Sequence, residues 1–217
     1  MSVEDQPIRV VVLGDTRERH NEVTVPPGDI LIHTGDFSLL GRNLNAVVDF
    51  NAWLGRLPHK HKIVVYGDQE LPLDSDPSMR GIIRNARVLL NQFVEIEGLR
   101  IWGAAAAPLY SPSSADANHR QRLFEKIPPA IDILITHGPP LGILDCPPGE
   151  MVHAGHPEVL EAAKRAQPCF HLFGHVQGAY GTRKIRRTTF VNACLCEPGG
   201  VLSQEPVVLA LPPHLKR

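Results

Sequence analysis

The sequence is poor in cysteine, in aromatic residues and in net charge, and these shortages exclude several classes of protein. Only 4 of its 217 residues are cysteines, and none has the Cys-x-x-Cys spacing of thiol redox centres or zinc ribbons. The formal net charge is −1, without the basic excess of proteins that bind nucleic-acid duplexes. With 43% hydrophobic residues, a chain of this length can bury a sizeable core without disulfides.

Long hydrophobic runs are also missing. No apolar segment approaches the roughly 20 residues that a membrane span requires, and residues 1–7 are polar rather than typical of a secretory signal. We therefore expect a cytoplasmic protein without a membrane partner, built as one domain over residues 8–212 between short tails at 1–7 and 213–217. The basic run Arg183–Arg187 is typical of a solvated hairpin rather than of a phosphate-binding site.

Five apolar segments of the sequence each end in glycine beside aspartate or histidine. The segments are 8–13, 30–33, 62–66, 131–136 and 170–173, and the residues that follow them are Asp15, Asp36, Asp68, His137 and His175. Ligands of open α/β sheets bind outside the carboxyl ends of the strands, so these side chains are expected to converge. Carboxylates and imidazoles together favour a divalent ion such as Mn, Fe or Zn. The alternative is that each glycine-aspartate pair only forms a turn.

The rest of the chain alternates between helical and extended patterns. Apolar spacing predicts helices at 44–57, 120–127 and 156–166, and a hairpin formed by residues 93–96 and 99–102. Loops are expected at 71–77 and 103–117, and strands at 188–191 and 207–211. Helices alternate with strands in the first half of the chain, and hairpins follow in the second half. This order indicates an α/β (α+β) fold with mixed sheets and helices on the outside.

The motifs at the strand ends resemble those of the calcineurin-like metallophosphoesterases. Their order is Asp-x-[His], Gly-Asp, Gly-[Asn-His-Glu], His-Gly and Gly-His-x-[His]. The segments Pro26–His33, Phe50–Gly55, Asp132–Gly142 and Phe173–His175 further resemble the metallophosphoesterase domain-containing (MPPED) subfamily. This resemblance implies an αββα sandwich that holds two metal ions bridged by one aspartate, here Asp36.

The resemblance implies that only one of the two metal positions still has residues that can all bind an ion. The second position keeps residues that can all ligate, namely Asp36, Asp68, His137 and His175. The first position has lost both of its histidines, and its residues here are Asp15, Arg17, Asp36 and Gln177. A guanidinium has no lone pair to donate to a metal. We therefore expect one divalent ion per chain, with the first position degenerate.

Three residues near the expected ion are candidates for a catalytic role. Arg17 would lie between Asp15 and the bridging aspartate and bind phosphoryl oxygens, or else it would point to solvent while Asp15 caps a turn. Gln69 replaces the histidine that assists the leaving group in the family, and general acid catalysis is typically worth ~10²–10⁴ in rate.

Three functions therefore stay open. The chain is a metal-dependent hydrolase of a small molecule such as a phosphodiester or nucleotide, or a pseudoenzyme that binds a nucleotide, a phosphate or a partner protein. In the third hypothesis the metal site performs lyase or isomerase chemistry on a non-phosphate substrate. The first is favoured because all residues of one metal position are still able to ligate.

Overall fold

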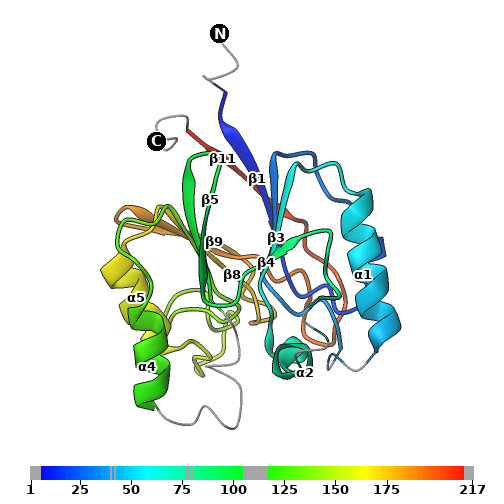
Figure 1. Cartoon of the computed structure of the whole chain (residues 1–217). Coiled ribbons are helices and arrows are strands. Elements are labelled where there is room, and N and C mark those ends of the chain that lie inside the picture. The colour runs from blue at the N-terminus through cyan, green and yellow to red at the C-terminus, as the bar shows by residue number, and fades with distance from the viewer. Residues whose placement is uncertain are drawn as a thin grey trace.

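The computed structural model describes residues 6–39, 41, 43–76, 79, 81–104 and 117–212. They form two mixed β-sheets that pack face to face, with helices on the outer faces (Figure 1). This is the αββα sandwich that the sequence predicts. No helix in these described ranges is long and apolar enough to cross a membrane.

The first sheet has the strand order β11-β1-β2-β3-β4. Strands β1 to β4 run parallel to one another, and β11 pairs antiparallel with β1. Residues Val10–Leu13 of β1 and Ile30–Ile32 of β2 are continuous apolar runs, as is typical of strands whose two faces are both covered. The bounds of the strands are β1 (Ile8–Leu13), β2 (Ile30–His33), β3 (His61–Val64), β4 (Arg87–Val88) and β11 (Val207–Leu211).

The second sheet has the strand order β5-β6-β7-β8-β10-β9. Its four central strands are parallel, and antiparallel hairpins join β5 to β6 and β9 to β10. The first hairpin confirms the one predicted over residues 93–102. The bounds are β5 (Gln92–Ile96), β6 (Leu99–Gly103), β7 (Ile133–Ile135), β8 (Phe170–Phe173), β9 (Gly181–Ile185) and β10 (Thr188–Asn192).

Helices cover the outer face of each sheet. Helix α1 (Leu44–Arg56) packs on the first sheet, whereas α4 (Ala117–Glu125) and α5 (Pro157–Ala166) pack on the second (Figure 1). The spacing of Val47, Phe50, Trp53 and Leu54 buries one face of α1, as the periodicity predicts. Two short 3₁₀ helices, η2 (His20–Glu22) and η3 (Asp68–Glu70), and the short helix α2 (Leu71–Ser75) complete the described elements.

The core has three apolar layers. Residues such as Val12 and Ile32 of the first sheet meet Ile133 and Leu172 of the second in the layer between the sheets. The other two layers lie between each sheet and its helices. The layers fix both sheets in place, so the loops at one end of the sandwich are held in a constant arrangement.

Two predicted segments differ from the structure. The prediction of a loop at 71–77 is wrong, because residues 71–75 form α2. Pro72 lies in the first turn of this helix, where the missing backbone N–H of proline breaks no helical hydrogen bond. The helix expected at 120–127 begins earlier, at Ala117, and ends at Glu125. Most of the loop expected at 103–117 lies outside the described residues, since only Gly103, Ala104 and Ala117 belong to them.

Candidate metal centre

The candidate site residues follow the carboxyl ends of parallel strands in both sheets. Asp15 and Asp36 come shortly after β1 and β2, Asp68 after β3, and His137 and His175 after β7 and β8. Asp15, Asp36 and His175 have φ angles of 57°, 56° and 69°, a left-handed conformation that is uncommon outside glycine but that Asp and His adopt more often than most residues. Strained backbone of this kind is concentrated at functional sites.

Four of these side chains form a cluster of metal-ligand type. Asp36, Asp68, His137 and His175 each offer a ligand atom, and all four atoms lie within 4.8 Å of one another. Asp68 Oδ1 lies 2.9 Å from His137 Nε2 and 3.0 Å from His175 Nδ1. Asp36 Oδ1 lies 3.3 Å from His137 Nε2. The structure thus brings together the residues that the sequence predicts as one metal position.

The imidazole of His137 is oriented by the backbone behind it. Its Nδ1 lies 2.9 Å from the carbonyl oxygen of Thr34, and a carbonyl can only accept, so Nδ1 carries a hydrogen and Nε2 faces the carboxylates. Burial alone would lower the pKa of His137, but the carboxylates of Asp36 and Asp68 raise it to about 10. The position between the carboxylates therefore favours positive charge.

The pKa of the Asp68 carboxyl moves in the opposite direction. Burial alone would raise it, but hydrogen bonds from His137 and His175 hold it below its ordinary value. Asp68 therefore stays ionised and can provide a negatively charged ligand oxygen.

The loop that carries Asp36 is fixed by a residue that the sequence analysis missed. Glu70 is fully buried and accepts hydrogen bonds from the backbone N–H groups of Asp36 (2.8 Å), Gly67 (2.9 Å) and Ser38 (2.9 Å), and from the hydroxyl of Ser38 (2.6 Å). Burial raises the pKa of Glu70, an effect that the bonds from Ser38 and Gly67 oppose. The spacing Gly67-x-x-Glu70 is that of a capping box and was the available signal.

Gly67 is required because the cluster packs against its Cα. A Cβ at this position would lie 2.1 Å from Asp36 Oδ1 and 2.8 Å from His137 Cε1. Any side chain here would displace two of the four clustered residues. The glycine after β3 thus has a steric role, in addition to ending the strand.

The side of Asp36 that faces away from His137 meets Arg17. The guanidinium Nη2 lies 3.5 Å from Asp36 Oδ2, and 26% of the Arg17 side chain is exposed. When the amide of Gln177 is oriented to satisfy its partners, its oxygen accepts from both terminal nitrogens of Arg17 at 3.2 Å, and its nitrogen donates to the Glu197 carbonyl. Arg17 and Gln177, two residues of the metal position that the resemblance implies is degenerate, therefore contact each other.

Two carboxylate oxygens at this position are buried without a hydrogen bond. They are Asp15 Oδ1 and Asp36 Oδ2, although Arg17 forms its ion pair with the latter. The other oxygen of Asp15 accepts from the backbone N–H of His175 at 3.0 Å. Buried carboxylate oxygens without hydrogen bonds are costly unless a cation lies beside them.

Gln69 lies beside the cluster as a hydrogen-bond donor. Its side-chain amide donates to Asp68 Oδ2 at 2.8 Å, and its backbone N–H donates to Asp36 Oδ1 at 3.1 Å. A neutral amide holds no proton that it can transfer near pH 7. Its contacts therefore orient the two carboxylates.

His33, by contrast, belongs to the scaffold of the sheet. Its Nδ1 accepts from the backbone N–H of Gly35 at 3.2 Å, so Nε2 carries the hydrogen and donates to the Thr16 hydroxyl at 3.1 Å. Burial lowers the pKa of His33 to about 3. The ring is therefore neutral, and both of its nitrogens are occupied.

Comparisons with known proteins identify the family and agree with the fold. No family model matches the sequence. Human metallophosphoesterase domain-containing protein 1 is 36% identical over 232 residues, an alignment that covers 94% of this chain and 71% of the human protein. A UPF0046 protein of Caenorhabditis elegans is 34% identical over 222 residues, covering 94% of this chain and 76% of the worm protein.

A solved structure shares the fold at low sequence identity. The phosphopantetheinyl hydrolase of Mycobacterium tuberculosis superposes with a TM-score of 0.59 at 13% identity, over 91% of this chain and 92% of that one. This likeness concerns the arrangement of the sheets and helices. The identity and coverage of the human and worm proteins carry the assignment: the chain belongs to the metallophosphoesterase domain-containing protein family.

Proposed function

We propose that this protein is a metal-dependent phosphoesterase that uses one divalent ion per chain and acts on a small phosphate ester. The observation that carries the proposal is the cluster of four donor groups within 4.8 Å of one another. Metallophosphoesterases usually bind divalent metals, which supports the same conclusion. The proposal concerns the number of ions, the substrate class and the roles of the residues.

The donor set fits a divalent ion. Two carboxylates and two imidazoles suit Mn, Fe and Zn, and the hydrogen bond that Nδ1 of His137 donates to the Thr34 carbonyl leaves Nε2 directed at the cluster. Asp36, Asp68, His137 and His175 would hold the ion. When bound, it supplies Lewis acidity that polarises a phosphoryl oxygen and acidifies water.

Arg17 provides the positive charge on the other side of Asp36. Its guanidinium lies 3.5 Å from the Asp36 carboxylate and contacts Gln177, which supports the idea that it takes the place of the second ion that the family resemblance implies. A guanidinium can bind two phosphoryl oxygens at once. We assign Arg17 the role of orienting the substrate phosphate, with Asp15 and Gln177 positioning the arginine.

The charges of the site favour a diester over a monoester. Asp15, Asp36 and Asp68 contribute three negative charges, against one divalent ion and Arg17, so the site is near neutral. A phosphate diester carries one negative charge near pH 7, whereas a monoester carries close to two, and the attraction for the second charge is weak here. Because Gln69 cannot protonate a leaving group, esters of acidic alcohols such as phenols should react fastest.

The test is turnover of bis(4-nitrophenyl) phosphate and of 4-nitrophenyl phosphate, with Mn, Fe or Zn added in turn. We expect metal-dependent turnover that is faster for the diester and is abolished in His175→Ala. His153→Ala is the matched control, because His153 is 52% exposed and bonds to Asp145 outside the cluster. One bound metal with no turnover of either ester would overturn the hydrolase and favour a binding protein or non-phosphate chemistry.

A further inference from the structure

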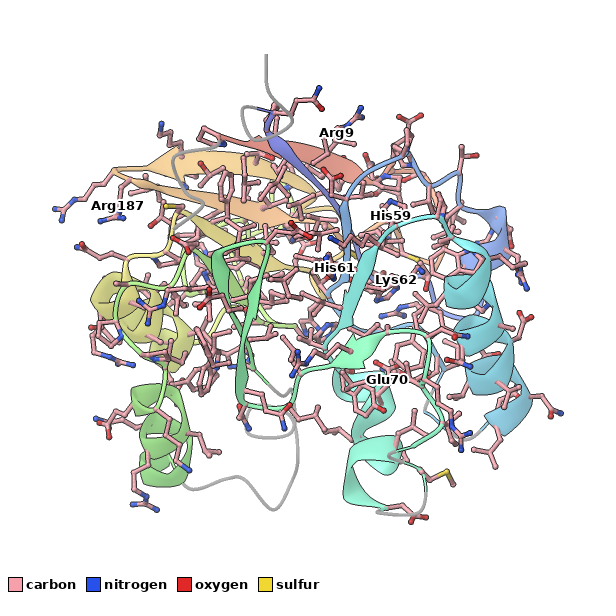
Figure 2. All side chains as sticks on the ribbon, turned by 45° about the horizontal axis from the view of Figure 1, so that its top comes forward. Arg9, His59, His61, Lys62, Glu70 and Arg187 are labelled. Carbon is pink, nitrogen blue, oxygen red and sulfur yellow. The ribbon has the colours of Figure 1, made fainter. Side chains whose placement is uncertain are left out.

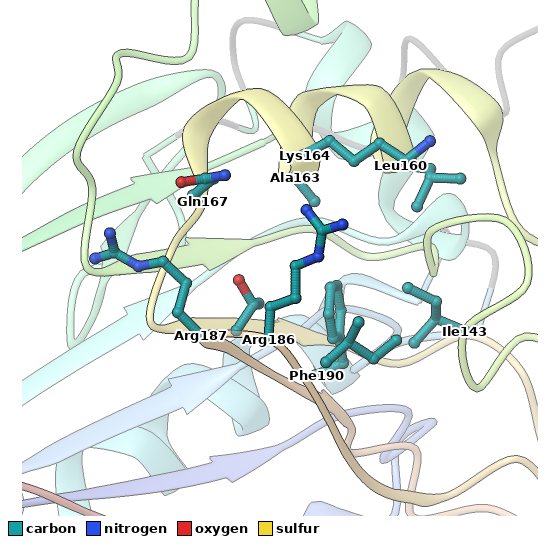
Figure 3. A pocket seen from close by; sticks show the side chains of 10 residues that line it. Ile143, Leu160, Ala163, Lys164, Gln167, Arg186, Arg187 and Phe190 are labelled. Atoms are coloured by element: carbon teal, nitrogen blue, oxygen red, sulfur yellow. The ribbon is translucent and has the colours of Figure 1, made fainter.

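A cavity lies on the outer face of the second sheet, between α5 and the β9–β10 hairpin (Figure 3). Its volume is about 520 Å³, within the range of small-molecule sites. The apolar side chains that line it include Ile143, Leu160 and Phe190, and those of Ile143 and Phe190 are buried in the layer beneath α5. The base of the cavity therefore offers an apolar surface for a ring or an alkyl chain.

The rim of this cavity is positively charged. It is lined by Lys164, Arg186 and Arg187, and by no aspartate or glutamate. Lys164 pairs with Glu161 along the surface of α5 at 2.7 Å. The side chains of Arg186 and Arg187, both exposed, form no ion pair or hydrogen bond with any residue in the part of the chain that the structure describes. Two guanidinium groups thus lie beside an apolar surface without a protein anion to neutralise them.

The side chain of Arg186 is directed at the cavity. Figure 3 shows it extending from the hairpin into the gap below α5, with Lys164 on the facing helix. Figure 2 shows Arg187 at the edge of the molecule remote from α1. Arg186 and Arg187 form the two-residue turn between β9 and β10, and Arg186 has a φ of 53°. Such turns favour glycine or asparagine, so an arginine here incurs a conformational cost that a role of its side chain would explain.

From these observations we propose that the cavity binds a small amphipathic anion, a molecule with an apolar ring or chain and a carboxylate or phosphate group. The apolar part lies on Phe190 and Leu160, and the anionic group is bound by Arg186 and Arg187, with Lys164 adding to the positive field. Charge-assisted hydrogen bonds from guanidinium to such groups are among the strongest in proteins. The apolar base selects against fully polar anions such as inorganic phosphate.

This site is separate from the candidate metal centre. Strand β10 runs parallel to β8, and His175 follows the carboxyl end of β8, whereas Arg186 and Arg187 precede β10. The arginines therefore lie at the opposite end of the sheet. The inference consequently does not rest on the proposed phosphoesterase function.

The experiment is calorimetric titration of the full chain with 2-naphthoate and with its neutral counterpart 2-naphthamide. We expect 2-naphthoate to bind with a Kd below about 1 mM and at least about tenfold more tightly than the amide, since tenfold corresponds to one modest charge-assisted contact. The variant Arg186→Asn/Arg187→Ser should lose this preference. Asparagine tolerates the positive φ of the turn, so the hairpin should remain folded.

The matched control is Arg183→Asn/Lys184→Ser, which removes two charges from the same hairpin at exposed positions that do not line the cavity. It should retain the preference of the unmodified protein to within about twofold, as expected for screened surface charges. Equal binding of acid and amide, equal losses in both variants, or no binding of 2-naphthoate at millimolar concentration would each overturn the proposal.

Discussion

Replacing both Arg17 and Gln177 with histidine should create a second metal position beside Asp36. Arg17 Nη2 lies 3.5 Å from Asp36 Oδ2, and Gln177 contacts both terminal nitrogens of the arginine at 3.2 Å. Asp15 Oδ1 and Asp36 Oδ2 are buried there without hydrogen bonds. Two imidazoles at these positions would complete a set of four donors. The Arg17→His/Gln177→His variant should therefore bind about two ions per chain, because four protein ligands suffice for one divalent ion.

The metal-free form of this variant should be less stable than the unmodified protein. It loses the guanidinium that faces a fully buried carboxylate, and breaking a buried ion pair costs about 3–5 kcal/mol. Because a quarter of the Arg17 side chain is exposed to solvent, solvent screens the pair and we expect a smaller loss of about 2–3 kcal/mol. Added Mn should recover this loss, since a bound ion stabilises the folded state by mass action.

The second ion should also accelerate hydrolysis of a phosphodiester. Lewis-acid stabilisation of a second oxygen is worth several kcal/mol, which corresponds to a gain in kcat of about 10²–10³-fold. The assays are metal content by mass spectrometry, thermal unfolding with and without Mn, and turnover of bis(4-nitrophenyl) phosphate. Arg19→His/Gln204→His is the matched control, because Arg19 pairs with Glu22 and Gln204 bonds to Glu197. One bound ion and unchanged kcat in excess Mn would refute the reasoning that Arg17 occupies the place of an ion.

Three further predictions follow from the scaffold of the centre. Gly67→Ala should abolish metal binding, because its Cβ would lie 2.1 Å from Asp36 Oδ1, whereas Gly81→Ala meets nothing within 4 Å and should leave metal content unchanged. Glu70→Gln should lower the free energy of unfolding by about 2–3 kcal/mol in urea titrations, since it weakens charge-assisted bonds to three backbone N–H groups; no change in stability would contradict the role of this carboxylate. Burial lowers the pKa of His171 to about 3, so the neutral ring stabilises the folded state fully above pH 6.5, and this stabilisation is lost as the pH falls toward 3. Between pH 7 and 5 the free energy of unfolding should therefore fall by about 2 kcal/mol more in the unmodified protein than in His171→Gln.

The sequence predicted the parts of the fold that depend on local pattern. Short, mainly apolar runs without helical spacing identified β1, β2 and β8, because strands covered on both faces need no polar alternation. The glycine that ends each strand located Asp36 and His175 at the carboxyl ends, where parallel strands converge. Such features require only the residues next to one another in the chain.

Features that depend on contacts between distant segments were not predictable in the same way. Two such contacts join different loops: the hydrogen bond from the Asp36 backbone N–H to Glu70, and the contact between Arg17 and Gln177. The spacing of residues within one segment therefore does not predict them. Residues 71–75 were predicted as part of a loop but form a helix, and the proline at position 72 is compatible with its first turn. The contacts of Glu70 and Arg17 depend on how separate loops pack together.

The central claim is that one divalent ion is held by Asp36, Asp68, His137 and His175. The most direct test is the metal content per chain of protein purified without chelator, measured by mass spectrometry beside the His175→Ala variant. The account predicts about one equivalent in the unmodified protein and loss of that ion in the variant. Two equivalents in the unmodified protein, or none after incubation with Mn, Fe or Zn, would contradict it.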